Sequence, residues 1–116
     1  MSDNKKLFIK IFRVELEETS TDIALLVDIY RDRYQSREIT HYVQQENEAL
    51  LEREIHCLEK LVPELDKFPL DDYPDKDSFI EGLSVFLKNF VKVNQFPQAV
   101  FLLAERKLQK VVKYIY

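Results

Sequence analysis

The sequence is poor in the residues that interrupt regular secondary structure. Its 116 residues include a single glycine and four prolines. A β-rich fold of this length needs several tight turns, most of which favour glycine at positive φ. The composition therefore predicts an all-α fold with few connections between its helices. The length predicts one helical-bundle domain over residues 1–116, large enough to bury its own core.

Several kinds of catalytic site are also missing. The single cysteine, Cys57, excludes an intramolecular disulfide and a zinc knuckle. The only glycine, Gly82, lies inside a predicted helix, so the chain has neither a phosphate-binding loop nor a G-x-S-x-G elbow. His41 and His56 are expected to face solvent, whereas Cys57 is expected in the core, about 100° around the helix from His56. We therefore expect no enzyme activity and no cofactor.

No long hydrophobic run is present. The longest uncharged stretch, residues 93–104, is too short to span a bilayer. At the N-terminus, Lys10 and Arg13 interrupt the apolar stretch that a signal peptide would need. These features predict a cytoplasmic protein that does not contact a membrane.

Hydrophobic residues recur with the helical period of about 3.6 residues along most of the chain. The run Thr19–Ser20–Thr21–Asp22 resembles a helix N-cap and divides the first of these regions in two. No helix-breaking residue separates the second predicted helix from the third, so the sequence leaves open whether these two helices are continuous. The expected helices cover residues 5–18, 22–35, 37–62, 78–93 and 97–116.

These segments predict an all-α antiparallel bundle of four to five helices with one long central helix. The central helix, residues 37–62, would be roughly 40 Å long at ~1.5 Å per residue. A compact domain of this size has a diameter of only about 26–28 Å. Either the molecule is elongated, or a second copy covers the ends of this helix.

Two segments are candidates for contact with a partner. Residues 66–77 form the one long linker, which is acidic and carries three hydrophobic side chains; it is either a solvated connector or a docking loop. The last helix carries a basic outer face with one exposed leucine, although basic residues near a helix C-terminus also complement the helix dipole. The candidate partner-binding residues are Phe68, Leu70, Tyr73, Leu102, Arg106, Lys110 and Lys113.

Four carboxylates fall inside predicted apolar faces: Glu15, Glu18, Glu46 and Glu54. Burying a carboxylate without a partner is costly, so each must pair with a basic group, reach solvent or bind a ligand. The first two outcomes make these groups structural. The third predicts a metal- or cation-binding bundle.

Charge is distributed unevenly along the chain, whose net charge is −4. Residues 44–81 carry four basic and twelve acidic groups, whereas residues 82–116 carry six basic and one acidic group. The acidic balance is not typical of a nucleic-acid-binding protein. Pairing of the two regions across a two-fold axis predicts a homodimer that buries Phe8, Phe12 and the stripe over residues 50–65. The competing hypothesis is an elongated monomer whose stripe binds another protein.

The sequence therefore predicts a small non-enzymatic interaction or regulatory protein, of the adaptor or dedicated-chaperone type, that acts through protein–protein contacts. The alternative is a ligand- or metal-binding helical bundle that uses the inward carboxylates.

Overall fold

The computed structural model of the protein describes residues 2–116 and contains no strand in that range. It confirms the all-α prediction, with four α-helices and two short 3₁₀ turns between the second and third. The helices are α1 (Ser2–Gln35), α2 (His41–Glu64), α3 (Lys76–Val93) and α4 (Gln98–Ile115), and the turns are η1 (Leu65–Lys67) and η2 (Leu70–Asp72).

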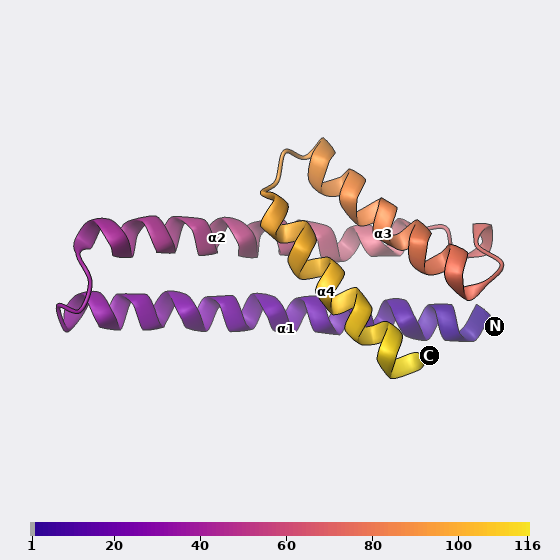
Figure 1. The fold of residues 1–116 in the computed structure, drawn as a ribbon, viewed down its shortest axis with the longest axis horizontal. Coiled ribbons are helices and arrows are strands. Elements are labelled where there is room, and N and C mark those ends of the chain that lie inside the picture. Colours follow the sequence, from indigo (N-terminus) through magenta and orange to yellow (C-terminus); the bar gives the residue numbers. More distant parts are fainter. Residues whose placement is uncertain (1) are drawn as a thin grey trace.

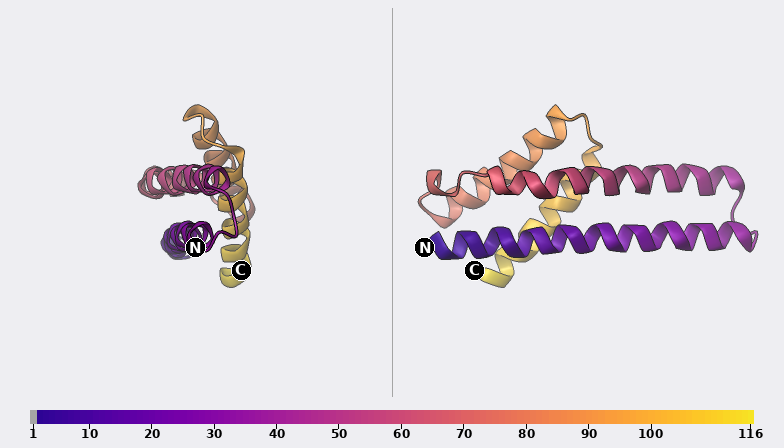
Figure 2. Two further views of the ribbon diagram at one scale, coloured as in Figure 1. Left: turned by 90° about the vertical axis from the view of Figure 1, so that its left-hand side faces the viewer. Right: turned by 180° about the vertical axis from the view of Figure 1, so that it is seen from behind.

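The four helices form two antiparallel hairpins of unequal length. Figure 1 shows α1 and α2 side by side along the long axis, with α3 and α4 crossing them diagonally near the end that holds both termini. Figure 2 shows that α3 and α4 lie on one face of the long hairpin. The molecule measures 55 × 28 × 18 Å. It is therefore elongated, which is one of the two outcomes that the length of the predicted central helix allowed.

The first helix is continuous where the sequence predicted a break at residues 19–22. The Thr19 hydroxyl donates to the Glu15 carbonyl oxygen at 2.8 Å, and the Thr21 hydroxyl donates to the Glu17 carbonyl oxygen at 3.3 Å. These hydroxyls bond to the preceding turn, so they do not cap a new helix. The longest helix is consequently α1, with 34 residues, rather than the predicted central helix.

A tight turn at Arg37 separates α1 from α2 and settles the question of their continuity. The Glu38 amide donates to the Arg33 carbonyl oxygen at 2.8 Å, and the Arg37 amide donates to the Tyr34 carbonyl oxygen at 3.0 Å. Arg37 has φ of 64°, so this is a Schellman motif with a non-glycine residue at the left-handed position. α2 then begins at His41, after Thr40, whose hydroxyl accepts from the Val43 amide at 3.2 Å.

Ser78 and Glu81 have the spacing of a capping box, which predicts that the fourth helix starts at Ser78, but α3 starts earlier. Asp75 is the N-cap, and its carboxylate accepts from the Ser78 amide at 2.8 Å. The hydrogen bonds from Ser78 lower the pKa of Asp75. The helix therefore starts two residues before Ser78.

Aromatic side chains join α1, the α2–α3 connection and α3 into one core. The Phe8 ring lies 5.3 Å from the Phe79 ring and 6.1 Å from the Tyr116 ring, and the Phe68 ring lies 5.8 Å from Phe79. Phe8 and Phe12 are fully buried within this single chain, so the prediction that they form a dimer surface is wrong. The predicted stripe over residues 50–65 is also largely internal, since its buried members are Cys57, Leu58, Leu61, Val62 and Leu65.

Candidate functional site

About half of the long hairpin extends beyond the shorter one. The α3–α4 hairpin reaches α2 at Glu54, which shares a hollow with Ala99 and Leu102, and reaches α1 at Glu15. Beyond these points, Figures 1 and 2 show α1 and α2 continuing alone to their connecting turn. We call residues 20–50, which form this two-helix extension, the arm.

The interior of the arm is narrow. Ile23 and Val27 are its buried hydrophobic residues, and Gln44 is a buried polar one. The Gln44 amide donates to the Glu48 carboxylate, which also accepts from Arg31 Nε at 3.0 Å. Two helices with so few buried side chains are marginal as an isolated pair. A third element packed on the arm would therefore add substantially to its stability.

The two broad faces of the arm differ in chemistry. On one face Arg31 forms ion pairs with Glu48, with Glu52 at 3.8 Å and with Asp28 at 4.0 Å. The other face is apolar and largely exposed. We call it the arm face; its members are Leu25, Leu26 and Ile29 from α1 and Val43 and Leu50 from α2, with exposed fractions between 38% and 57%.

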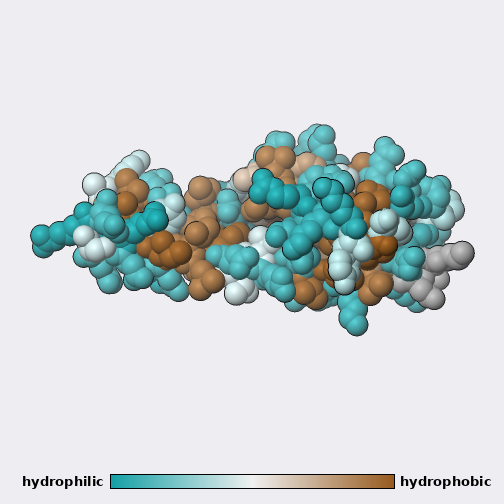
Figure 3. Space-filling view, turned by 60° about the horizontal axis from the view of Figure 1, so that its bottom comes forward, coloured by the Kyte–Doolittle hydropathy of each residue, from teal (hydrophilic) through white to brown (hydrophobic). Residues whose placement is uncertain are grey.

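The helical period places the arm face on the same side of the hairpin as α4. Leu26 and Ile29 lie eleven and fourteen positions after Glu15, which α4 contacts, so about three and four helical turns separate them. Leu50 lies four positions before Glu54, the contact of α4 with α2. Figure 3 shows hydrophobic side chains continuing along the arm beyond α4. The arm face is therefore an uncovered extension of the surface on which α4 packs.

The four carboxylates predicted to point inward do not come together. Glu15 alone is both inward and paired: it accepts from Lys110 at 2.8 Å and lies 3.9 Å from Lys107. The pairing raises the pKa of Lys110. Glu18 and Glu46 are exposed, so the prediction that they face inward is wrong. Among the side chains that the structure describes, no three of the His, Cys, Asp or Glu type are grouped so that they could hold a metal ion.

Glu54 is half-buried beneath α4, and desolvation raises its pKa. A carboxyl whose pKa is higher in the folded than in the unfolded state destabilises the fold at pH above both values and not below them. We expect Glu54→Gln to stabilise the protein at pH 7 by less than about 1 kcal/mol, because the group keeps partial solvent contact. The gain should vanish below about pH 4.

Urea unfolding at pH 7 and pH 4 measures this effect. Glu46→Gln, on the exposed side of the same helix, is the matched control and should leave the midpoint unchanged at both pH values. A larger gain at pH 4 than at pH 7 would contradict the assigned cause.

The residues predicted to bind a partner from the linker are part of the fold. Phe68 is buried, and its ring stacks on the Tyr73 ring at 5.1 Å. Leu70 packs against the same core. The carbonyl oxygen of Tyr73 also accepts from Lys5 of α1. These contacts pin residues 66–75 to the bundle, so the three side chains offer little surface to a partner in this structure.

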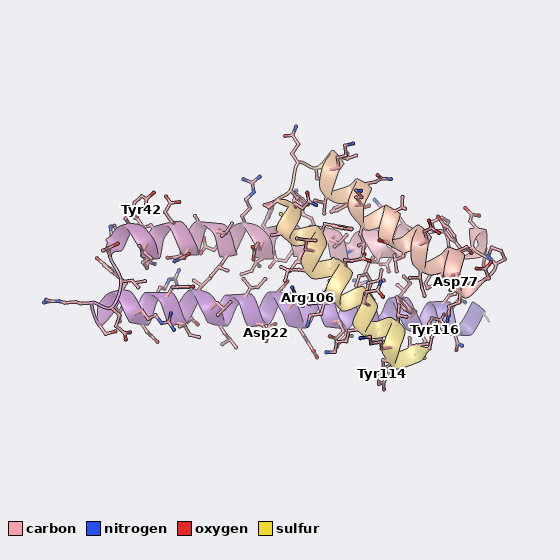
Figure 4. All side chains as sticks on the ribbon, in the orientation of Figure 1. Asp22, Tyr42, Asp77, Arg106, Tyr114 and Tyr116 are labelled. Atoms are coloured by element: carbon pink, nitrogen blue, oxygen red, sulfur yellow. The ribbon has the colours of Figure 1, made fainter. Side chains whose placement is uncertain are left out.

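The residues predicted from α4 remain on the surface. Leu102, Arg106 and Lys113 are exposed, whereas Lys110 is engaged with Glu15. Figure 4 shows Arg106 on α4 where it crosses the long hairpin, and Tyr114 beyond α1 near the C-terminal end of α4. Tyr114 is 78% exposed and lines an open groove of about 500 Å³ with Ile11, Glu15, Lys110, Val111 and Lys113.

The two histidines and the single cysteine lie where the sequence predicts them. His41 and His56 are exposed and Cys57 is buried in the core, which confirms the three placements. Burial is the largest cause of the raised pKa of the Cys57 thiol. A buried thiol with a raised pKa is a poor nucleophile.

No family model matches the chain, and no curated protein or solved structure is significantly similar to it. None of the described helices is long and apolar enough to cross a membrane.

Proposed function

We propose that the chain is a small non-enzymatic interaction protein of the adaptor or dedicated-chaperone type, and that the arm face is its main contact surface. The observation that carries the proposal is the uncovered apolar surface on a helical pair with almost no core of its own. Its five hydrophobic residues leave 38–57% of their surfaces in water. Contiguous apolar patches rimmed by polar residues mark interaction sites in soluble proteins.

The chemistry of the chain supports contact rather than catalysis. The thiol of Cys57 is buried, and the two histidines are exposed and separate from it. Proteins are the expected partners, because the net charge of −4 disfavours binding to nucleic acid. We place this role in the cytoplasm, without membrane contact. The basic outer face of α4, with Leu102, Arg106 and Lys113, is proposed as a secondary contact.

Site-specific photo-crosslinking in the native cell tests the proposal. A photoreactive benzoylphenylalanine in place of Leu25 should yield discrete adducts with one or a few proteins. The same group in place of Tyr42 should yield none, because Tyr42 is 71% exposed but lies at the outer edge of α2, away from the arm face. Adducts from both positions in equal yield, or from neither, would refute the arm face as a specific contact surface.

A further inference from the structure

We propose that the occupant of the arm face is the arm face of a second copy of this chain. The two α1 helices would cross antiparallel about a two-fold axis between Leu26 and Ile29. The inference rests on the proposed function, because it names the partner of the surface proposed there. In this dimer the interface is the arm face, and Phe8 and Phe12 are not part of it.

The first argument is a self-complementary charge pattern on α1. A two-fold axis that relates Leu26 to Ile29 also relates Asp22 to Arg33, because both pairs have the same midpoint in the sequence. Asp22 of each copy would then face Arg33 of the other. Such a pattern favours self-association, whereas a surface edged by charges of one sign would favour a partner of the opposite charge.

The charged groups in this pattern are free to make these contacts. Asp22 and Arg33 are exposed, and within the described part of the chain neither side chain forms an ion pair, while the Arg33 guanidinium lies 5.7 Å from the centroid of the Tyr30 ring. Figure 4 shows Asp22 on the arm segment of α1, away from α3 and α4. By contrast, Arg31 on the opposite face already pairs with three carboxylates. The unpaired charges therefore lie beside the apolar face, where a second chain would pack.

The second argument is steric. The α3–α4 hairpin occupies the same face of the long hairpin at the end near the termini (Figure 2). A parallel pairing of two arms would bring both α3–α4 hairpins to one end and press them together. An antiparallel pairing places them at opposite ends, with the turn of each arm directed toward α4 of the other copy. The fold thus permits the orientation that the charge pattern requires.

The size of the arm face is adequate for a specific contact. With 16 residues of α1 from position 20 to its end at Gln35, it is about 24 Å long at ~1.5 Å per residue. Two helices packed at about 10 Å make it roughly 20 Å wide. The resulting footprint of ~500 Å² per partner, about 1,000 Å² in total, lies below the ~1,600 Å² of a standard interface and at the ~1,000 Å² that a specific contact needs.

Charge-reversal variants of α1 distinguish a dimer formed through the arm face from a dimer formed through any other surface. We expect wild-type protein at tens of micromolar to have about twice the 13.9 kDa mass of the chain in light scattering on a sizing column. Asp22→Arg alone and Arg33→Asp alone should each weaken association at least about tenfold, because the two-fold axis repeats each repulsive contact. An equimolar mixture of the two variants should recover the two-chain mass, since every reversed charge again meets its opposite.

The double variant, with both reversals in one chain, should also dimerise within about threefold of the wild type. Asp77→Arg, an exposed residue on α3 with the same change in charge, is the matched control and should leave association unchanged. Mixing cannot repair a folding defect, so recovery in the mixture is specific to the contact.

Two outcomes would overturn the inference. A wild-type mass near 13.9 kDa at 100 μM would show that no second copy binds. A two-chain mass that both single variants retain would place the dimer interface elsewhere. In the first case, a photo-adduct at Leu25 with a different protein would leave the proposed function intact. If the wild type is monomeric and Leu25 also gives no photo-adduct, both proposals are refuted.

Discussion

We expect Phe8→Ala to lower the free energy of unfolding by about 3–5 kcal/mol, the usual cost of truncating a fully buried phenylalanine. Phe8 is completely buried, and its ring lies beside those of Phe12 on the next turn of α1, Phe79 of α3 and Tyr116 after α4. Truncation would leave a cavity between α1 and α3, which are joined mainly through this aromatic cluster. The loss is a large share of the 5–15 kcal/mol typical of a domain.

Equilibrium urea unfolding followed by circular dichroism measures the effect. Leu7→Ala is the matched control, because Leu7 precedes Phe8 on the same turn and is 45% exposed; its cost should be ~0.5 kcal/mol. The difference between Phe8→Ala and the wild type should be the same at 5 and 100 μM protein. A difference that grows with concentration would mean that Phe8 contacts a second chain, in conflict with its burial here.

The sequence predicts the helices well and their ends less well. Phe79, Leu83 and Leu87 follow the helical period and are buried on the inner face of α3, whereas Val93, which the same period predicts on that face, is exposed. The break predicted at Thr19 is absent, because a threonine hydroxyl can bond either to the next turn as a cap or to the preceding turn. Packing decides between the two, and here Thr19 is buried against the hairpin interior. Local sequence carries no information about that choice.

The arm face illustrates what periodicity alone cannot determine. In the helix predicted over residues 5–18, apolar residues cover more than half of the circumference, which is wider than one neighbouring layer usually buries. Which part of the arc is covered depends on where α4 crosses α1. That crossing leaves Leu25 and Ile29 exposed while Phe8 and Phe12 lie in the core. The exposed stripe predicted over residues 50–65 is largely internal, and the apolar surface that the structure leaves exposed is the arm face, which begins where α4 ends its contact with Glu15.

The second prediction with a large expected effect on stability concerns the single glycine. Gly82 lies inside α3, where alanine would ordinarily stabilise the helix by about 1 kcal/mol. A Cβ at Gly82, however, would lie 2.9 Å from the Tyr73 hydroxyl oxygen and closer still to its ring. The ring is held by stacking on Phe68. We expect Gly82→Ala to destabilise the protein by about 1–2 kcal/mol, because overpacking costs more than the helix gains.

A double-mutant cycle with Tyr73→Ala identifies the cause, because the steric conflict requires both side chains. In the Tyr73→Ala background, Gly82→Ala should be stabilising by about 0.5–1 kcal/mol, so the sign of its effect reverses. In the wild-type background it should also speed chymotrypsin cleavage within residues 66–75, since a displaced Tyr73 ring releases the segment that Phe68 and Lys5 hold. If Gly82→Ala stabilised both backgrounds equally, the ring would have moved aside at no cost, and the connection between α2 and α3 would be looser than its stacked rings indicate. Destabilisation with unchanged proteolysis would instead place the strain within α3, since the connection would then have kept its packing.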